Sequence, residues 1–211
     1  MYKLISATPS PYARKVRIQL AEKEIPFELI TEVPWNSDTQ TPLYNPLEKL
    51  PVLICPDGTS VFESLYINEW IEYKHPAPPL IPKEIDGILA VKRYEVIADG
   101  ACDALVQMFF EIARDPDKQS KPWFDRHQRK VNGALRSFSD SVGSKEFCYG
   151  DRLTLADVAV GTFLRYLTVR WPGMPWREQF PNLAIYSDRL ELRPSFMGTV
   201  PVPQVIRDRV A

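Results

Sequence analysis

A proline that opens a short apolar run is the clearest sign of ligand chemistry in this sequence. Pro51 follows Leu50 and precedes Val52–Ile54, which has the composition of a buried strand. Proline cannot donate to a sheet, and only a bond before proline is readily cis. A cis bond would turn the main-chain N–H and C=O of Leu50 outward, where they can pair with an extended, peptide-like ligand. The alternative is an ordinary trans proline that begins an edge strand.

Two serines stand where helices are expected to begin. Ser10 precedes Pro11 and the amphipathic stretch 12–23, so Ser10 suits the N-cap and Pro11 the first helical position. Glu63 and Ser64 open a second helix that carries apolar residues on one face. A structural role at a helix start accounts for all of these residues.

A third helix start has the pattern of a capping box. Thr154 is followed three residues later by Asp157 and then by an apolar run. In this pattern the threonine side chain accepts from the backbone N–H of Asp157, and the carboxylate reaches back to the N–H of Thr154. We interpret the pair as a folding device rather than a catalytic one.

The first 75 residues have the pattern of a small α/β domain. Residues 1–6 and 27–33 are strand candidates on either side of the first helix, which predicts a parallel pair with a crossover helix. Residues 52–54 and 60–62 are short strands, and the turn signal at 55–59 joins them in a hairpin. The catalytic candidates therefore lie in loops that connect these strands to helices.

A proline-rich segment separates this region from a helical one. We expect an α/β domain over residues 1–76, a linker over 77–82 and an all-helical domain over 83–211. The helical domain contains four segments with apolar residues at helical spacing, and its tail from Pro194 is expected to be irregular. These segments are residues 83–112, 122–142, 154–170 and 182–192.

Composition excludes several classes of function. The 211-residue chain is 45% hydrophobic and 25% charged, with a formal net charge of -1 and no basic block, so nucleic acid is not an expected partner. No signal-peptide pattern or membrane-length apolar run is found. The cysteines Cys55, Cys102 and Cys148 are too scattered for a disulfide framework or a metal site. We expect a cytoplasmic protein without a metal.

Four motifs, taken together and in order, resemble those of the glutathione transferase superfamily, in its serine-type members. They are Ser10–Arg17, the stretch Asn45–Leu53, the pair after Phe62, and Leu153–Asp157. The resemblance covers the whole chain and is strongest to small bacterial and fungal members. It implies a thioredoxin-like N-terminal domain, an all-α C-terminal domain and a homodimer. One departure is Glu48, which replaces the usual glycine before Lys49.

The resemblance implies that glutathione is the co-substrate and that its sulfur reacts as a thiolate, which is the nucleophilic form. Ser10 would donate to that sulfur, and the positive end of the helix that begins at Pro11 would assist. Thr8 and Tyr12 are the rival hydroxyls. Members that perform thiol–disulfide exchange carry a cysteine in this loop. None occurs in residues 7–12, so we do not expect that chemistry.

The resemblance also assigns the residues that bind glutathione. Leu50, supported by a cis Pro51, would pair with the cysteinyl main chain. Ser64 and the helix N-terminus suit the γ-glutamyl carboxylate, and Glu63 suits the ammonium group. Lys49 would pair with the glycyl carboxylate. For each charged residue the alternative is a solvated surface position or a helix cap.

The expected reaction is attack of the glutathione thiolate on an electrophilic carbon of an apolar small molecule. Ether cleavage and peroxide reduction use the same thiolate. Met108 and Phe109, late in the long helix, would line the second-substrate pocket between the domains, with Trp35 as a further candidate; core packing is the alternative for each. A non-catalytic, glutathione-binding carrier or regulatory protein on the same fold is the rival function.

Overall fold

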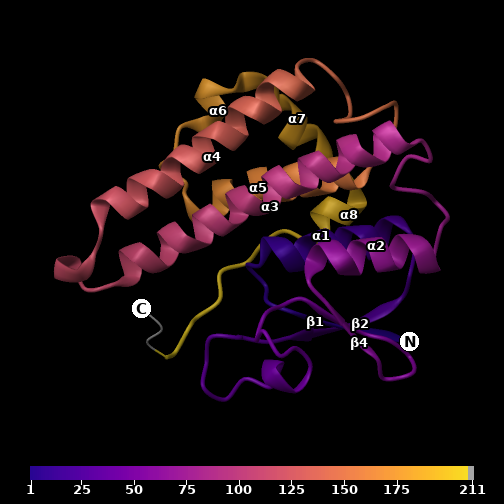
Figure 1. Cartoon of the computed structure of the whole chain (residues 1–211), viewed down its shortest axis with the longest axis horizontal. Coiled ribbons are helices and arrows are strands. Elements are labelled where there is room, and N and C mark those ends of the chain that lie inside the picture. Colours follow the sequence, from indigo (N-terminus) through magenta and orange to yellow (C-terminus); the bar gives the residue numbers. More distant parts are fainter. Residues whose placement is uncertain (209–211) are drawn as a thin grey trace. The chain divides into compact units, whose positions relative to one another are not determined.

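The computed structural model describes residues 1–208, which form two compact units (Figure 1). The first contains Met1–Ile81 together with the segment that begins at Leu192, and the second contains Pro82–Glu191. The sequence placed residues 83–211 in one helical domain. The structure differs because the chain returns to the first unit after Glu191.

The first unit is built on a four-stranded mixed sheet of order β2-β1-β3-β4. Strand β1 (Tyr2–Ser6) pairs in parallel with β2 (Phe27–Thr31) and antiparallel with β3 (Val52–Ile54), and β3 pairs antiparallel with β4 (Ser60–Phe62). The expected parallel pair and hairpin are therefore confirmed. Gly58, with φ of 88°, provides the left-handed residue of the hairpin turn.

Two helices and a 3-10 turn accompany the sheet in the N-terminal part of the first unit. Helices α1 (Pro11–Glu22) and α2 (Ser64–Lys74) pack together on the same side of the sheet, and η1 (Thr41–Leu43) lies in the loop between β2 and β3 (Figure 1). Their apolar faces meet the sheet in a common core. This core includes Leu4, Val16, Leu20, Leu53, Val61, Ile67 and Ile71.

The segment after Leu192 is partly helical, which corrects the expectation of an irregular tail. Helix α8 (Pro194–Met197) begins with proline at its first position and contacts α1. Buried Arg14 on α1 donates to the Phe196 carbonyl at 3.1 Å and to the Thr199 hydroxyl at 3.3 Å. These long-range bonds satisfy the end of a helix that is too short to be stable alone.

The second unit is all-helical. Long helices α3 (Ile85–Ala113) and α4 (Lys121–Val142) contact each other, and α3 also contacts α5 (Leu155–Arg170), which is buried along most of its length. The structure adds two short elements to this helical pattern, η2 (Pro116–Lys118) and α6 (Trp176–Gln179). The helix expected at 182–192 is α7 (Pro181–Glu191). No helix within residues 1–208 has the length and apolar composition that a bilayer span requires.

Asp157, at the start of α5, connects three parts of the second unit. Its Oδ2 accepts from the amide of Thr154 at 2.8 Å and from the Thr154 hydroxyl at 2.9 Å. Its Oδ1 accepts from the amide of Cys148 at 2.6 Å and from the Tyr186 hydroxyl at 2.7 Å. The capping interaction is present, and the same fully buried carboxylate also joins the preceding loop to α7.

Candidate functional site

The strand register brings the candidate residues of the first unit together at one end of the strands. Ile5 of β1 pairs with Val52 of β3, and Val52 pairs with Phe62 of β4. Three connections therefore meet at the same end of the strands. They are the loop after β1, the residues before β3 and the residues after β4. Ser10, Leu50–Pro51 and Glu63–Ser64 all belong to these three connections. The sheet thus positions segments that are far apart in the sequence.

Ser10 is the N-cap of α1, and its hydroxyl keeps a proton to donate. Its Oγ accepts from the Ala13 amide at 3.1 Å, as a capping side chain does. A hydroxyl has one donor and two acceptor positions, so this bond leaves the O–H free to donate elsewhere. Among residues 1–208 no acceptor is found for it. The structural and chemical interpretations of Ser10 are therefore compatible.

The hydroxyl of Thr8, the alternative to Ser10 as a donor to the thiol, already donates a hydrogen bond within the protein. It donates to the Val202 carbonyl at 2.9 Å, while the Val202 amide donates to the Thr8 carbonyl at 3.3 Å. A proton held in this way is not available to a ligand. Tyr12 is half-buried in the first turn of α1. Ser10 is therefore the better placed of the loop hydroxyls.

The Leu50–Pro51 bond is cis, which resolves the two alternatives for this proline. Leu50 and Pro51 are both buried, and Leu50 belongs to the apolar cluster that contains Ile5 and Ala7. Within the part of the chain that the structure describes, the main-chain N–H and C=O of Leu50 have no hydrogen-bond partner. They form an unpaired backbone edge next to the loop that contains Ser10.

The start of α2 contains an unpaired buried hydroxyl. Ser64 is 1% exposed and its Oγ has no hydrogen-bond partner among residues 1–208. Buried polar groups are normally paired, so an orphan group at a helix N-terminus indicates a missing polar partner. The preceding Glu63 is exposed and has φ of 72°, a backbone conformation that residues other than glycine rarely adopt. Such strain is typical of ligand-binding positions.

The loop before Leu50 is held by Asn45. Its side-chain amide donates to the Lys49 carbonyl at 2.8 Å and its Oδ1 accepts from the Leu47 amide at 2.9 Å. Lys49 itself is exposed. Glu48 has φ of 54°, the left-handed region that favours glycine. This explains why the pattern that the sequence resembles has glycine at this position.

The two residues expected in the second-substrate pocket differ in their surroundings. Met108 is fully buried in the helical unit, so packing accounts for its side chain. Phe109 is partly exposed, contacts Phe110 edge to face with ring centroids 5.2 Å apart, and lies 4.6 Å below the guanidinium carbon of Arg170. Only Phe109 of the pair has surface open to a ligand within this unit.

The cysteines do not provide reactive thiols. Cys55, Cys102 and Cys148 are free and buried. Burial raises the pKa of the Cys55 thiol, and burial together with the nearby Asp157 carboxylate raises the pKa of the Cys148 thiol well above its usual value. Neither of these two thiols therefore has the lowered pKa of a reactive cysteine. The described residues contain no group of histidines, cysteines and carboxylates able to hold a metal.

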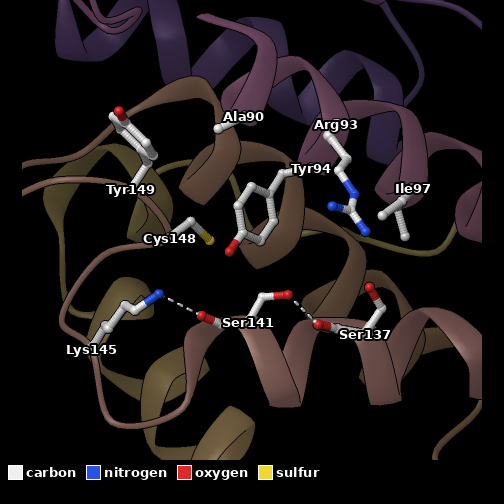
Figure 2. Close-up of a pocket in the computed structure, with 9 residues that line it drawn as sticks. All are labelled: Ala90, Arg93, Tyr94, Ile97, Ser137, Ser141, Lys145, Cys148 and Tyr149. Carbon is white, nitrogen blue, oxygen red and sulfur yellow. Dashed lines mark hydrogen bonds between the residues drawn. The ribbon is translucent and has the colours of Figure 1, made fainter. Parts of the chain in front are cut away.

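A separate cavity of about 240 Å³ lies in the helical unit, between α3, α4 and the loop that follows α4 (Figure 2). Arg93 and Tyr94 of α3 face Ser137 and Ser141 of α4 across it, and Lys145 donates to the Ser141 carbonyl at 2.8 Å. None of its lining residues carries a carboxylate. Of the residues named individually from the sequence, Cys148 is the one that lines it.

Nothing in the sequence indicated that the C-terminal segment lies beside Thr8, in the loop before α1. Val202 forms two hydrogen bonds with Thr8, and Thr8 precedes Ser10 by two positions in the sequence. They join positions 194 residues apart and one of them involves only main-chain atoms. Neither feature leaves a pattern in a single sequence.

Two family descriptions match this chain. "Glutathione S-transferase, N-terminal domain" matches residues 9–74 and "Glutathione S-transferase, C-terminal domain" matches residues 121–189. Among curated proteins, the uncharacterized GST-like protein YibF of Escherichia coli K12 is 34% identical over 199 residues, which are 94% of this chain and 98% of that protein.

Solved structures similar to this chain are also glutathione S-transferases. A glutathione S-transferase of Methylobacterium radiotolerans in complex with glutathione sulfonate is 58% identical, with a TM-score of 0.98 over 100% of this chain and 99% of that one. A glutathione S-transferase of Methylobacillus flagellatus with bound glutathione is 37% identical, with a TM-score of 0.92 over 96% of this chain and 100% of that one.

Proposed function

Because this chain belongs to the glutathione S-transferase family, we propose that it joins the thiolate of glutathione to an electrophilic carbon of an apolar small molecule. The glutathione compounds held by the two solved relatives support the first substrate. The observation that carries the proposal is the Ser10 hydroxyl, which caps α1 and retains a proton at the edge of the sheet where the unpaired groups of Leu50 and Ser64 also lie.

Ser10 and the N-terminus of α1 would both lower the pKa of a thiol bound beside them. A free thiol has a pKa of about 8.5 and is a few per cent thiolate at pH 7. A hydrogen bond to a charged acceptor contributes about 1.5–3 kcal/mol, and a helix N-terminus adds about 0.3–1 kcal/mol. Since one pKa unit corresponds to about 1.4 kcal/mol, the two together lower the thiol pKa by roughly one to three units.

The thiol proton leaves to solvent, and the Ser10 O–H donates to the sulfur anion that remains. The sulfur lone pair then forms a bond to the electrophilic carbon. In a displacement the bond to the leaving group breaks and its electron pair leaves with that group. In an addition to an activated double bond, the neighbouring carbon takes up a proton. Ether cleavage follows the displacement scheme.

The remaining site residues bind the tripeptide. Leu50 pairs its free main-chain groups with the cysteinyl residue, as an added strand would. The Ser64 hydroxyl and the backbone N–H groups at the N-terminus of α2 donate to the γ-glutamyl carboxylate, which satisfies the orphan hydroxyl. Glu63 pairs with the γ-glutamyl ammonium, and Lys49 pairs with the glycyl carboxylate at the exposed end.

Two substitutions of Ser10 separate catalysis from helix capping. Ser10→Ala removes both the hydroxyl and the cap, whereas Ser10→Gly removes the hydroxyl at a cost of only a few tenths of a kcal/mol in capping. We expect both variants to bind glutathione and to lose about 10²-fold in kcat with 1-chloro-2,4-dinitrobenzene. Ser10→Thr, which keeps a hydroxyl, is the control.

Full turnover by both variants would make Ser10 only a cap and direct attention to Tyr12. Glutathione binding without turnover of any electrophile by the wild-type protein would favour a carrier. A steady-state assay measures turnover, and calorimetric titration measures the binding of glutathione.

We also propose that the protein is a homodimer in a reducing compartment, the cytoplasm. Three apolar residues on one face of α3 support the association: Ile85, Leu89 and Val96 are 69%, 58% and 63% exposed. Their spacing of four and seven residues places them on one side of the helix. The free thiols of the three cysteines suit a reducing compartment.

A further inference from the structure

Two cationic side chains border the cavity in the helical unit. Arg93 comes from α3 and Lys145 from the loop after α4, and they lie on opposite sides of the Tyr94 ring (Figure 2). The Arg93 guanidinium forms no hydrogen bond or ion pair with a residue in the described range 1–208. Lys145 uses one of its three ammonium donors on the Ser141 carbonyl. Both cations therefore keep donors for an anion.

The other polar groups of the lining extend these donors on one side. Ser137 lies on the same side of the Tyr94 ring as Arg93 (Figure 2), and its hydroxyl has no partner within the described part of the chain. Tyr94 stacks on Phe138 of α4 with ring centroids 6.1 Å apart, which fixes the ring between the two cations. The Tyr149 hydroxyl instead donates to Glu84 at 3.2 Å and is not a donor to the cavity.

No group in the lining neutralises the two cations. The lining has no carboxylate, and burial raises the pKa of the Cys148 thiol, so that thiol is uncharged at pH 7. Two like charges around one hollow favour an anion that pairs with both. The volume of about 240 Å³ is below the roughly 300–1,000 Å³ of pockets for drug-sized ligands, so the occupant is a small molecule.

We propose that this cavity is a second binding site, for a short organic dianion whose two acidic groups pair with Arg93 and Lys145. Ser137 donates to the acidic group on the Arg93 side. The carbon chain between the two groups lies against the Tyr94 ring and the apolar lining residues Ala90 and Ile97. The site shares no residue with the candidate site of the first unit, so it does not depend on the proposed transferase activity.

A pair of simple acids tests the requirement for two negative groups. Glutarate and pentanoate have the same carbon chain and differ by one carboxylate. We titrate both by calorimetry at constant ionic strength, because salt screens charge, and with glutathione in excess so that carboxylate sites for glutathione are filled. The proteins are the wild type, Arg93→Gln, Lys145→Gln and the control Arg136→Gln. Arg136 is an exposed residue of α4 that does not line the cavity.

We expect the wild type and Arg136→Gln to bind glutarate at least about fivefold more tightly than pentanoate, which is the upper range for an exposed ion pair. Arg93→Gln and Lys145→Gln each leave one cation, so each should lose this preference. Equal binding of the two acids by the wild type, or no binding of glutarate, overturns the proposal. A preference that survives in both variants also overturns it, as does an equal loss in Arg136→Gln, which would indicate a diffuse charge effect.

Discussion

At the scale of single residues, Ser10 caps α1 and keeps the hydroxyl proton that its proposed catalytic role requires. Its oxygen accepts from the Ala13 amide, which fixes the side chain at the start of α1. The same bond leaves the hydroxyl proton free to donate to another group. A separate catalytic side chain would need its own positioning contacts. Here the helix start provides them.

Glu48 is a residue whose replacement should stabilise the protein. Its φ of 54° costs a residue with a Cβ about 1 kcal/mol relative to glycine. We expect Glu48→Gly to raise the free energy of unfolding by several tenths to about 1 kcal/mol, part of the gain being offset by the entropy of glycine in the unfolded chain. Urea unfolding at pH 7 measures this change.

The same substitution tests the charge at the glycyl end of the site. Removal of the carboxylate beside Lys49 should tighten glutathione binding by a few fold at low salt. Glu48→Ala is the matched control, because it removes the charge but keeps the φ strain. Equal stability of the glycine and alanine variants would contradict the strain argument, and equal affinity in all three proteins would contradict the electrostatic one.

At the scale of elements, the first-unit motif Ser10–Arg17 has a second, structural use. Arg14 donates to Phe196 and Thr199, and Arg17 donates to the Gly198 carbonyl at 3.1 Å. The basic residues of the motif therefore hold the end of α8 and direct the chain toward Val202. The sequence indicated a helix here but not this contact.

The Glu22 carboxylate should make this docking pH-dependent. Burial alone would raise the pKa of Glu22, but hydrogen bonds from Arg193 and Ser195, together with the charge of Arg193, outweigh it and lower the pKa. A lowered pKa gives stability that is present above the unfolded value of about 4.5 and is lost as pH falls through the folded value.

We therefore expect the free energy of unfolding to decline below about pH 4.5 in the wild type and to decline less in Glu22→Gln. Urea unfolding at a series of pH values from neutral to acid gives both curves. Parallel curves for the two proteins would show that Glu22 does not couple the segment to pH.

Asp157 should be more costly to replace than a helix cap. Loss of a cap costs about 1 kcal/mol. Removing a buried carboxylate that accepts four hydrogen bonds leaves Thr154, Cys148 and Tyr186 with unpaired donors, which costs several kcal/mol in comparable buried sites. We expect Asp157→Ala to lose about 3 kcal/mol or more and Asp157→Asn to lose less. Thermal unfolding is the measurement, and a loss near 1 kcal/mol would make Asp157 a cap only.

At the scale of the whole molecule, the features predicted from sequence are those with local signals. The hairpin has its turn residues at 55–59, and α5 has its capping pair at Thr154 and Asp157. The two-part α/β and all-helical fold is confirmed. Short α6 and α8 escaped prediction because a four-residue helix has almost no periodicity.

The candidate site could be predicted only where it coincides with such signals. Ser10, Pro51 and Ser64 lie at a helix start, a strand start and a helix start, and the strand register then brings these connections together. The path of residues 202–208 depends on tertiary hydrogen bonds to main-chain groups. The acceptors of those bonds are main-chain carbonyls, which leave no pattern in a single sequence.

The proposed dimer gives a prediction at this scale. If the apolar face of α3 is covered by a second copy, a charge on it should separate the copies, because burying an unpaired carboxylate is costly. We expect light scattering to give twice 24.2 kDa for the wild type and 24.2 kDa for Leu89→Glu. Ile185→Glu on α7 is the control of similar exposure and should remain dimeric. A monomeric wild type would refute the dimer.

The most direct test of the central claim is the ultraviolet thiolate absorbance of bound glutathione as a function of pH, for the wild type and Ser10→Ala. We predict that the bound thiol has a pKa well below the free value of about 8.5 in the wild type and that the variant raises it by at least about one unit. A bound glutathione whose thiol pKa is unshifted, or is the same in both proteins, would contradict activation by Ser10.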